Sequence, residues 1–514
     1  MWVLGDQLSP RISSLEGFGP GECVVFMAES RERARLLPYH KQKLALLWSA
    51  MRHFANELRG MGYTVDYRVT GGDFGEALAE HVEEYGPGRI RLMDTAEYGV
   101  AGRLARAVGE LGVECEVTTQ SMFLSGREEF ARRSEGKKLL VMESFYRRMR
   151  RETGLLMDGG EPEGGSWNYD KENREPPPGR DSLPGIPAYE PDRITAEVME
   201  LVEREFPENF GSLEGFGWPV TRKQAGEFLE DFLENRLDLF GPYEDAMLTG
   251  EPALYHSQLS PLLNLGLLEP LDVCERAEER YRRGEARLNS VEGFIRQILG
   301  WREFVYQIHH LEMPGYTEEN YLGAKIPLPE FYWSGETRMH CVSDAVSSLI
   351  ENGVNHHIQR LMVTGNFALI AGIDPQEVNE WYWYAYADGY EWVTTPNVIG
   401  MTLYADGGVF ATKPYAASAN YIDKMSDYCK HCSYNPRKTT GEDACPFNAL
   451  YWDFLDRNAE SFENNPRMNL AMSNLKKKKD LQEIRAKAKE IRDSLREQPG
   501  VVETYYPGGS ASGG

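Results

Sequence analysis

The sequence predicts an α/β domain with a doubly wound parallel sheet over residues 1–125, followed by an all-α domain over residues 195–500. Two observations support this division. In the first part, short apolar runs alternate with segments of helical periodicity, which is typical of a parallel sheet covered by helices on both faces. In the second part, apolar residues recur at helical spacing almost throughout, interrupted by Pro and Gly.

Strand and helix signals follow one another in a regular order in the first part. Strands are expected at residues 2–4, 24–27, 64–69 and 90–93, and helices at residues 41–61, about 74–84 and 100–111. Ligands bind to such sheets beyond the carboxyl ends of the strands, so the expected site contains Asp6 and Gln7 after the first strand and Glu29 after the second. No G-x-G-x-x-G sequence follows the first strand, so a nicotinamide dinucleotide is not expected.

Between the two parts the periodicity weakens, and residues 126–194 are expected to form an interdomain linker. Residues 158–192 are rich in Gly, Pro and Glu, as in a long segment that crosses the surface. A short helix near the start of the linker carries four arginines among aromatic residues: Arg147, Arg148, Arg150 and Arg151. At the other end of the chain, residues 501–514 finish in Gly and Ser and are expected to be a disordered tail.

The composition limits the location and the partners of the protein. The chain has 514 residues, a formal net charge of −24 and seven cysteines. Seven cysteines in a chain of this length do not suggest a disulfide framework, so we expect a reducing cytoplasm. No stretch is long and apolar enough to cross a bilayer, and the first residues lack the pattern of a signal peptide. The acidic charge argues against indiscriminate binding to nucleic acid but permits a local basic groove.

A group of cysteines near the C-terminus predicts an inorganic centre. Cys429 and Cys432 are separated by two residues, and Cys445, followed by Pro446, comes after twelve more. Thiolates at this spacing bind either structural zinc or an iron–sulfur cluster, and both centres require a fourth ligand. A Cys-Pro pair is common at the closing ligand of iron–sulfur sites and favours iron, although spacing alone leaves zinc open.

Two motifs in the helical part place polar side chains on or before apolar helices. His256, Ser257, Leu259 and Ser260 open one helix, where hydroxyl groups and free backbone amides suit a pyrophosphate. On this segment alone, an ordinary helix cap is the better explanation. Arg302, next to Trp301, precedes Glu303 on another helix, and an internal ion pair would account for that arrangement.

The adjacent histidines His356 and His357 lie on a third apolar helix. Neighbouring side chains diverge by about 100° on a helix, so the two rings do not readily share one metal. One of them suits a proton donor in a cavity, whereas a buried structural histidine explains the pair more simply when it is taken alone. The aromatic run at 381–392 either relays single electrons or fills the core.

Together these motifs resemble the photolyase/cryptochrome superfamily, and most closely its prokaryotic iron–sulfur branch, the bacterial (6-4) photolyases. The resemblance extends from residue 4 to about residue 458 and is carried by segments 4–10, 142–147, 256–261, 289–297, 301–304, 356–362, 381–392, 413–418 and 443–452. It implies light-driven repair of pyrimidine(6-4)pyrimidone photoproducts, in which excited reduced FAD passes an electron to a lesion that is flipped out of the duplex.

The resemblance also implies three cofactors. A bent FAD would lie in the helical domain against the residues that match the family's flavin contacts: Tyr243, His256, Ser257, Leu259, Ser260, Trp301, Arg302, Arg360 and Asp388. A 4Fe–4S cluster would take Cys341, Cys429, Cys432 and Cys445, which decides the metal against zinc. A 6,7-dimethyl-8-ribityllumazine would serve as antenna in the α/β domain, at Asp6, Gln7 and Glu29. Tyr39-His40 stands where relatives tend to have paired histidines, which puts the contacts of the antenna in question.

Further roles follow from the same resemblance. His356 and His357 match the active-site histidines, with His357 as the expected proton donor, and Tyr415 and Tyr421 match residues of the lesion pocket. Trp381, Tyr382 and Trp333 resemble the chain that photoreduces the flavin. The implied partner is UV-damaged DNA, held in a basic groove formed by the four linker arginines and Lys413, and the protein is expected to be a monomer.

Two other functions are compatible with parts of the sequence. A cryptochrome-like blue-light receptor would need the same cofactors, although the His356-His357 pair favours repair. A primase-type module would combine a four-cysteine cluster with helical nucleic-acid binding and would lack a flavin. The α/β domain argues against the primase-type module, and flavin absorbance of the purified protein would exclude it.

Overall fold

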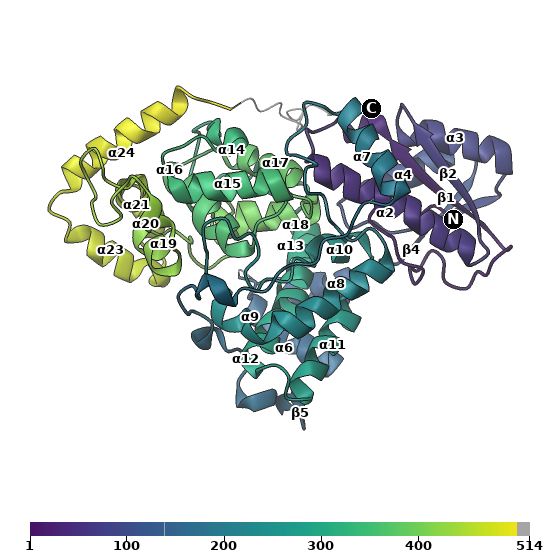
Figure 1. Cartoon of the computed structure of the whole chain (residues 1–514), viewed down its shortest axis with the longest axis horizontal. Coiled ribbons are helices and arrows are strands. Elements are labelled where there is room, and N and C mark those ends of the chain that lie inside the picture. The colour runs from purple at the N-terminus through teal and green to yellow at the C-terminus, as the bar shows by residue number, and fades with distance from the viewer. Residues whose placement is uncertain (138, 501–514) are drawn as a thin grey trace.

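A computed structural model of the chain describes residues 1–137 and 139–500 (Figure 1). Its α/β domain is built on a parallel sheet, in which β1 (Val24–Ser30) pairs with β2 (Thr64–Thr70) and β3 (Arg89–Met93) pairs with β4 (Glu114–Thr118). Trp2 forms parallel bridges to both Phe26 and Leu92 and so joins the two pairs. The spatial order is therefore β2, β1, Trp2, β3, β4, which is the order of a doubly wound sheet and confirms the predicted fold class.

The strands differ from the prediction at two places. The expected strand at residues 2–4 is a single bridge at Trp2, and β4 was not expected at all. The two glutamates in β4 have low strand propensity, and the strand is only five residues long, so its pattern is weak. The strand is fixed by its pairing with β3, a long-range contact that no local pattern contains.

Helices cover both faces of this sheet. They are α1 (Arg31–Ala34), α2 (Lys41–Gly60), α3 (Phe74–Tyr85) and α4 (Val100–Glu110). Phe26, Leu92 and Leu78 belong to a small core cluster with α3 and α4 on one face. On the other face, Met27 and residues of α2 belong to the large cluster that continues into the helical domain. The α/β domain is thus joined to the rest of the molecule by a continuous apolar core beneath α2.

The segment expected to be a linker contains regular structure of its own. Its elements are α5 (Arg127–Ser134), α6 (Met142–Thr153), β5 (Met157–Asp158), β6 (Glu161–Pro162), η1 (Glu163–Gly165), η2 (Asp170–Glu172) and η3 (Arg180–Ser182). The strands β5 and β6 form a short antiparallel pair. Helix α6 packs against the helical domain and carries the four arginines of the expected basic groove.

The structure divides these four arginines, so the expectation of one basic groove is corrected. Arg150 is fully buried and donates to the carbonyl oxygens of Leu155 and Trp167, because its guanidinium closes the turn after α6. Arg147 and Arg148 pair with glutamates at 3.0 and 3.2 Å. Arg151 is exposed, with its guanidinium 4.5 Å from the centroid of the Trp167 ring.

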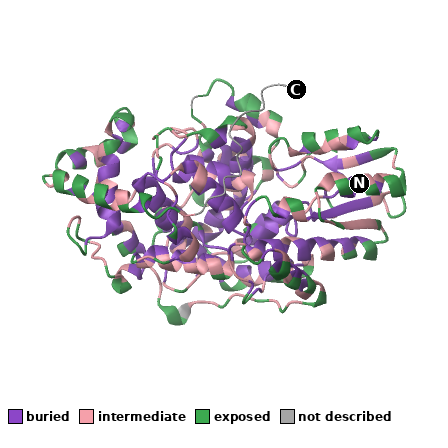
Figure 2. Ribbon diagram, turned by 90° about the horizontal axis from the view of Figure 1, so that it is seen from above, coloured by how far each residue is buried: buried purple, intermediate pink, exposed green. Residues whose placement is uncertain are grey.

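The rest of the chain is helical, as predicted. The α-helices are α7 (Arg193–Glu205), α8 (Arg222–Asn235), α9 (Leu237–Tyr243), α10 (Ser260–Leu265), α11 (Pro270–Arg282), α12 (Leu288–Ile295), α13 (Glu303–Glu312), α14 (Phe331–Ser334), α15 (His340–Asn352), α16 (Asn366–Ala371), α17 (Pro375–Ala385), α18 (Glu391–Thr395), α19 (Ala419–Met425), α20 (Tyr428–His431), α21 (Pro446–Arg457), α22 (Ala459–Phe462), α23 (Asn469–Lys476) and α24 (Leu481–Arg496). Two short 3₁₀ turns, η5 (Gly315–Glu318) and η8 (Pro466–Met468), lie between them. Buried residues are concentrated at the centre of this body, and exposed ones at its rim and on the last two helices (Figure 2).

Three π-helical turns interrupt helices at the centre of the body: η4 (Arg296–Arg302), η6 (Gln359–Gly365) and η7 (Pro396–Thr402). Such turns often occur at functional sites, because they re-aim side chains within a helix. Gly365 ends η6 where a Cβ would lie 2.4 Å from Thr402 and 2.6 Å from the Arg360 carbonyl oxygen. A larger residue would therefore push η6 away from η7.

The C-terminal region forms two helices, α23 and α24, which are separated at residues 477–480. The expected disordered tail, 501–514, lies outside the described residues. Among the described residues, no helix combines the length and the apolar character needed to cross a bilayer.

Candidate functional site

An ion pair between the half-buried Arg360 and the buried Asp388 lies at the centre of the helical domain. The two guanidinium nitrogens of Arg360 lie 2.9 and 3.1 Å from the two carboxylate oxygens of Asp388. The hydroxyl of Ser260 donates to the same carboxylate at 2.5 Å. Burial alone would raise the pKa of Asp388, but Arg360 and Ser260 hold it below its ordinary value. The carboxylate is therefore a fixed negative charge.

Neighbouring side chains hold this pair in place from several helices. Arg360 donates through Nε to the Asn355 carbonyl oxygen at 2.8 Å, and its guanidinium lies 4.1 Å from the ring centroid of Tyr386. The hydroxyl of Tyr382 donates to the Arg360 carbonyl oxygen at 2.7 Å. On the other side, Asn264 donates to the Asp388 carbonyl oxygen at 3.0 Å. Asn264 was missed from the sequence, although its position one helical turn after Ser260 places both side chains on one face of α10.

Two histidines lie face to face beside the ion pair. The rings of His256 and His356 are 4.3 Å apart and almost parallel. Both nitrogens of His256 lie 3.0 Å from backbone oxygens, those of Ala253 and Glu244. Both ring nitrogens of His356 are buried and have no hydrogen-bond partner among the described residues. A buried polar group without a partner points to a missing ligand.

His357, the next residue along the chain, is exposed. The protein around it, the positive charge of Arg360 and the nearby His256 lower the pKa of His357 to about 4. It follows that His357 is neutral at pH 7 in the free protein. Tyr415 is also exposed, and Tyr421 on α19 forms a hydrogen bond with the carboxylate of Asp245.

The other residues predicted to contact a flavin surround this centre at various positions. Tyr243 stacks on Tyr255 with centroids 5.3 Å apart. The amide of Leu259 donates to the Ser257 hydroxyl at 3.4 Å, in the turn that precedes α10. Gln258, between them, has a φ of 55°, which is strained for a non-glycine residue.

Trp301 and Arg302 lie on η4, and Arg302 contacts the end of the α/β domain. The ring of Trp301 lies 5.7 Å from that of Phe410. Arg302 pairs with Glu303 at 3.4 Å, donates to the Met122 carbonyl oxygen and lies 4.2 Å from the Phe123 ring centroid. This is the internal ion pair that would account for the Arg-Glu sequence, and the contacts of Arg302 tie η4 to the end of the α/β domain.

Aromatic rings lead away from the ion pair in a continuous series. Tyr386 lies 5.2 Å from Tyr382, and Tyr382 lies 5.1 Å from Trp381. Trp381 is buried and donates through its indole nitrogen to the Tyr332 carbonyl oxygen at 3.1 Å. Trp333 follows Tyr332 directly and is half-buried. The series of contacts thus runs from Arg360 through Tyr382 and Trp381 to the backbone beside Trp333.

The four predicted cluster ligands line one pocket. Cys341 lies in the first turn of α15, Cys429 on α20, Cys432 just after α20, and Cys445 at the residue before α21. The remaining walls are largely apolar and include Met339, Ile422 and Phe447. Burial and the neighbouring thiols raise the pKa of Cys341 well above its ordinary value. Among the described residues, no three metal-ligating side chains lie close enough together to hold a single ion.

The predicted antenna residues at the edge of the sheet have different environments. Burial and the nearby Glu97 raise the pKa of Asp6 to about 7. Gln7 donates to the carbonyl oxygens of Met93 and Asp94, both at 3.3 Å, while its own side-chain oxygen is buried without a partner among the described residues. Glu29 instead accepts two hydrogen bonds from Arg52 at 2.8 and 2.9 Å.

His40, which was expected near the antenna, contacts the helical domain. Its Nε2 lies 3.0 Å from the Leu349 oxygen and 3.2 Å from the Ile350 oxygen. The start of α2 therefore docks on the end of α15.

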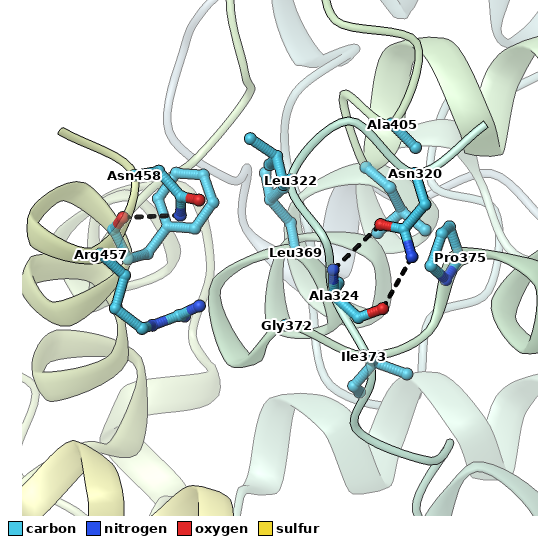
Figure 3. Close-up of a pocket in the computed structure, with 12 residues that line it drawn as sticks. Asn320, Leu322, Ala324, Leu369, Gly372, Ile373, Pro375, Ala405, Arg457 and Asn458 are labelled. Carbon is cyan, nitrogen blue, oxygen red and sulfur yellow. Dashed lines mark hydrogen bonds between the residues drawn. The ribbon is translucent and has the colours of Figure 1, made fainter. Parts of the chain in front are cut away.

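A second pocket lies apart from these residues (Figure 3). Asn320 and Ala324 close one wall through hydrogen bonds of 2.8 and 2.9 Å, and Arg457 and Asn458 stand at the opposite wall. None of the predicted site residues lines it.

Comparisons with known proteins identify the family. The family model described as "Deoxyribodipyrimidine photo-lyase-related protein" matches residues 1–218. A (6-4) photolyase from Agrobacterium fabrum is 49% identical over 471 residues, which cover 91% of this chain and 93% of that protein.

Two solved structures have the same fold. A bacterial class III photolyase from Agrobacterium tumefaciens matches with a TM-score of 0.55 at 17% identity, covering 98% of this chain and 92% of that chain. A cryptochrome from Synechocystis matches with a TM-score of 0.55 at 16% identity, covering 78% of this chain and 80% of that chain. At these identities the structural matches show the fold, whereas the extent and identity of the Agrobacterium fabrum match show the family. The chain belongs to the (6-4) photolyases of the photolyase/cryptochrome superfamily.

Proposed function

We propose that this protein repairs (6-4) photoproducts in DNA with light as the energy source. The observation that carries the proposal is the 49% identity with a (6-4) photolyase over almost the whole chain. The site agrees with it, because one helical segment carries both the exposed His357 and Arg360, which pairs with the buried Asp388.

The residues around Arg360 fit a flavin. His356 has two buried ring nitrogens without a partner among the described residues, and the Arg360–Asp388 pair offers a fixed cation and anion beside it. Ser260, His256 and Tyr243 would complete the binding site. FAD, when bound, supplies the light-excited electron donor. Tyr382 and Trp381 offer a route by which electrons enter from the protein surface near Trp333.

His357 would act on the lesion as a general acid. Its exposed ring can approach a nucleotide that is flipped out of the duplex. A neutral imidazole has to gain a proton first, and an anionic DNA strand bound beside it would raise its pKa. Tyr415 and Tyr421 would line the pocket for the lesion. Arg151 on the linker and Lys413 would contact phosphates, so binding should weaken as salt rises.

The cysteine pocket fits a 4Fe–4S cluster better than zinc. A single tetrahedral zinc, with Zn–S bonds of about 2.3 Å, would hold its sulfurs within about 4 Å of one another. Among the described residues, no three metal-ligating side chains lie close enough to hold a single ion, so a cluster of several iron atoms suits the four thiols better than one zinc. The cluster would connect Cys341 with Cys429, which lies 88 residues further along the chain. We assign it a structural role.

A ribityllumazine antenna would lie at the sheet edge near Asp6 and Gln7. The unpartnered side-chain oxygen of Gln7 and the buried Asp6 carboxyl are suitable partners for its polar ring and ribityl hydroxyls. The carboxylate of Glu29 already pairs with Arg52, so the role of Glu29 would be to shape the edge of the sheet.

The test is the spectrum of the purified protein together with a repair assay. Flavin and iron–sulfur absorbance, with blue-light-dependent repair of a (6-4) lesion, would support the proposal. Flavin-loaded protein that changes shape or redox state under light but repairs no lesion would instead identify a receptor of the cryptochrome type. Protein without flavin would leave the primase-type function.

A further inference from the structure

Lys43 on α2 crosses from the α/β domain into the helical domain and is almost completely buried. Its ammonium group donates to the carbonyl oxygen of Trp383 at 2.8 Å and to that of Gly389. The ring centroids of Tyr39 and Tyr390 each lie 4.9 Å from the ammonium nitrogen. The whole environment of this charge is therefore supplied by the protein.

A buried ammonium is costly unless its surroundings compensate for the lost water. Burial lowers the pKa of Lys43 to about 7, although Glu97 and Asp388 oppose the decrease. A methionine of similar length would fill the same space without that cost. The position of this charge is therefore the feature to explain.

The two carbonyl groups that Lys43 contacts bound the segment that carries Asp388. Trp383 lies in the last turn of α17, where carbonyl groups lack helical partners and the helix dipole favours a cation. The amide of His40 donates to another carbonyl of this turn, that of Tyr384, at 2.8 Å. The start of α2 therefore caps the end of α17 from a different domain.

The segment after α17 turns back tightly on the helix end. A Cβ on Gly389 would lie 2.6 Å from the carbonyl oxygens of both Tyr382 and Trp383. The carbonyl dipoles of this turn are thus crowded together, and the ammonium of Lys43 lies among them. Asp388, one residue before Gly389, is held in its bidentate pair with Arg360 on the opposite side.

We infer that Lys43 is a positioning residue that sets the flavin site from the α/β domain, by fixing the Trp383–Gly389 turn so that Asp388 stays paired with Arg360. This role rests on the proposed flavin site. It predicts that the flavin is held less firmly when Lys43 loses its charge, even though Lys43 belongs to the other domain.

Several titratable groups surround Lys43 and must be considered in a pH experiment. They are Arg33 and Tyr39 before α2, Glu97 after β3, Asp6 at the sheet edge, and Asp388 and Tyr390 after α17. Asp6 also has a pKa of about 7, so it needs its own control.

The experiment measures the rate at which FAD leaves the holoprotein in the dark, by flavin fluorescence, between pH 6 and pH 9. Wild type should release FAD several-fold faster above pH 7 than at pH 6. Lys43→Met should release it about tenfold faster at pH 6, which corresponds to one charge-assisted hydrogen bond, and without a pH dependence near 7. Lys43→Arg, which stays charged, should release it more slowly than Lys43→Met at pH 6.

The matched control is Lys41→Met, since Lys41 lies on the same turn but pairs with Glu203 at 2.8 Å. It should keep the wild-type rate and pH dependence. Asp6→Asn should also keep the pH dependence, and this comparison remains informative if Lys43→Met does not fold. Equal release from wild type and Lys43→Met, or a pH dependence lost in Asp6→Asn, would overturn the inference about Lys43. Wild-type protein that binds no FAD would instead overturn the proposed function.

Discussion

The rings of His256 and His356 stack 4.3 Å apart beside the Arg360–Asp388 pair. Burial lowers the pKa of His256 to about 4 and that of His356 well below its ordinary value. Both rings are consequently neutral at pH 7, and acid would place two positive charges face to face.

This stack predicts sensitivity to acid. In the unfolded chain His256 binds a proton below about pH 6.5, whereas in the folded protein it does so only below about pH 4. The free energy of unfolding therefore falls as the pH decreases from about 6.5 to about 4. One such group accounts for up to about 3 kcal/mol. Urea unfolding of the apoprotein at pH 7 and pH 4.5 measures the loss, and His256→Gln should reduce it. An equal loss in wild type and His256→Gln would contradict the assignment to His256.

Asp388→Asn should remove FAD binding and destabilise the fold. The half-buried guanidinium of Arg360 would lose its counter-charge, which costs about 3 kcal/mol, the lower end of the range for buried pairs. Thermal unfolding and the flavin content after purification measure the two effects. The double variant Arg360→Met with Asp388→Asn should recover much of the stability, because no unpaired charge remains, but not the flavin. Flavin retained at the wild-type level by Asp388→Asn would argue against this pair as part of the flavin site.

His357→Ala should retain flavin and cluster but lose repair by about 100-fold or more, the usual contribution of a general acid. The ring is exposed, so its removal leaves packing unchanged. The control is His53→Ala on α2. Among the ion pairs of the described residues, the His53 ring takes part in one, with the exposed Asp192. Repair of a (6-4) lesion under blue light, normalised to flavin content, measures the effect. Undiminished repair by His357→Ala would exclude it as the proton donor.

Cys341→Ser should lower the iron content from roughly four atoms per chain towards zero and destabilise the helical domain. Cys341 lies far in sequence from the other three ligands, so its loss releases α15 from α20 and α21. Cys115→Ser, on β4, is the matched control and should keep the iron. Metal analysis decides the identity of the centre, and stoichiometric zinc in the wild-type protein would contradict an iron–sulfur cluster.

Much of the fold follows from local patterns. The βαβα alternation places α2, α3 and α4 within a residue or two of their observed bounds, because apolar periodicity and caps such as Asp73 act locally. Strand β4 escaped detection, since its stability comes from pairing with β3 rather than from its own residues.

The site could be predicted only in part. The motifs identified Arg360, Asp388 and Ser260 through resemblance, and the structure brings them together. Arg150 was grouped with the basic residues because charge is visible in a sequence, whereas its burial is not. Lys43 gave no signal either, since its partners are backbone carbonyl groups from a distant helix.

The central claim is that this chain uses light to repair a (6-4) photoproduct, and a single-turnover assay tests it most directly. Purified wild-type protein with reduced FAD is mixed with an oligonucleotide that contains one (6-4) lesion and is exposed to blue light, and the restored strand is separated from the damaged one. The account predicts restored pyrimidines in the light and none in the dark. Damaged strand that remains unchanged under light, with flavin bound and reduced, would contradict it.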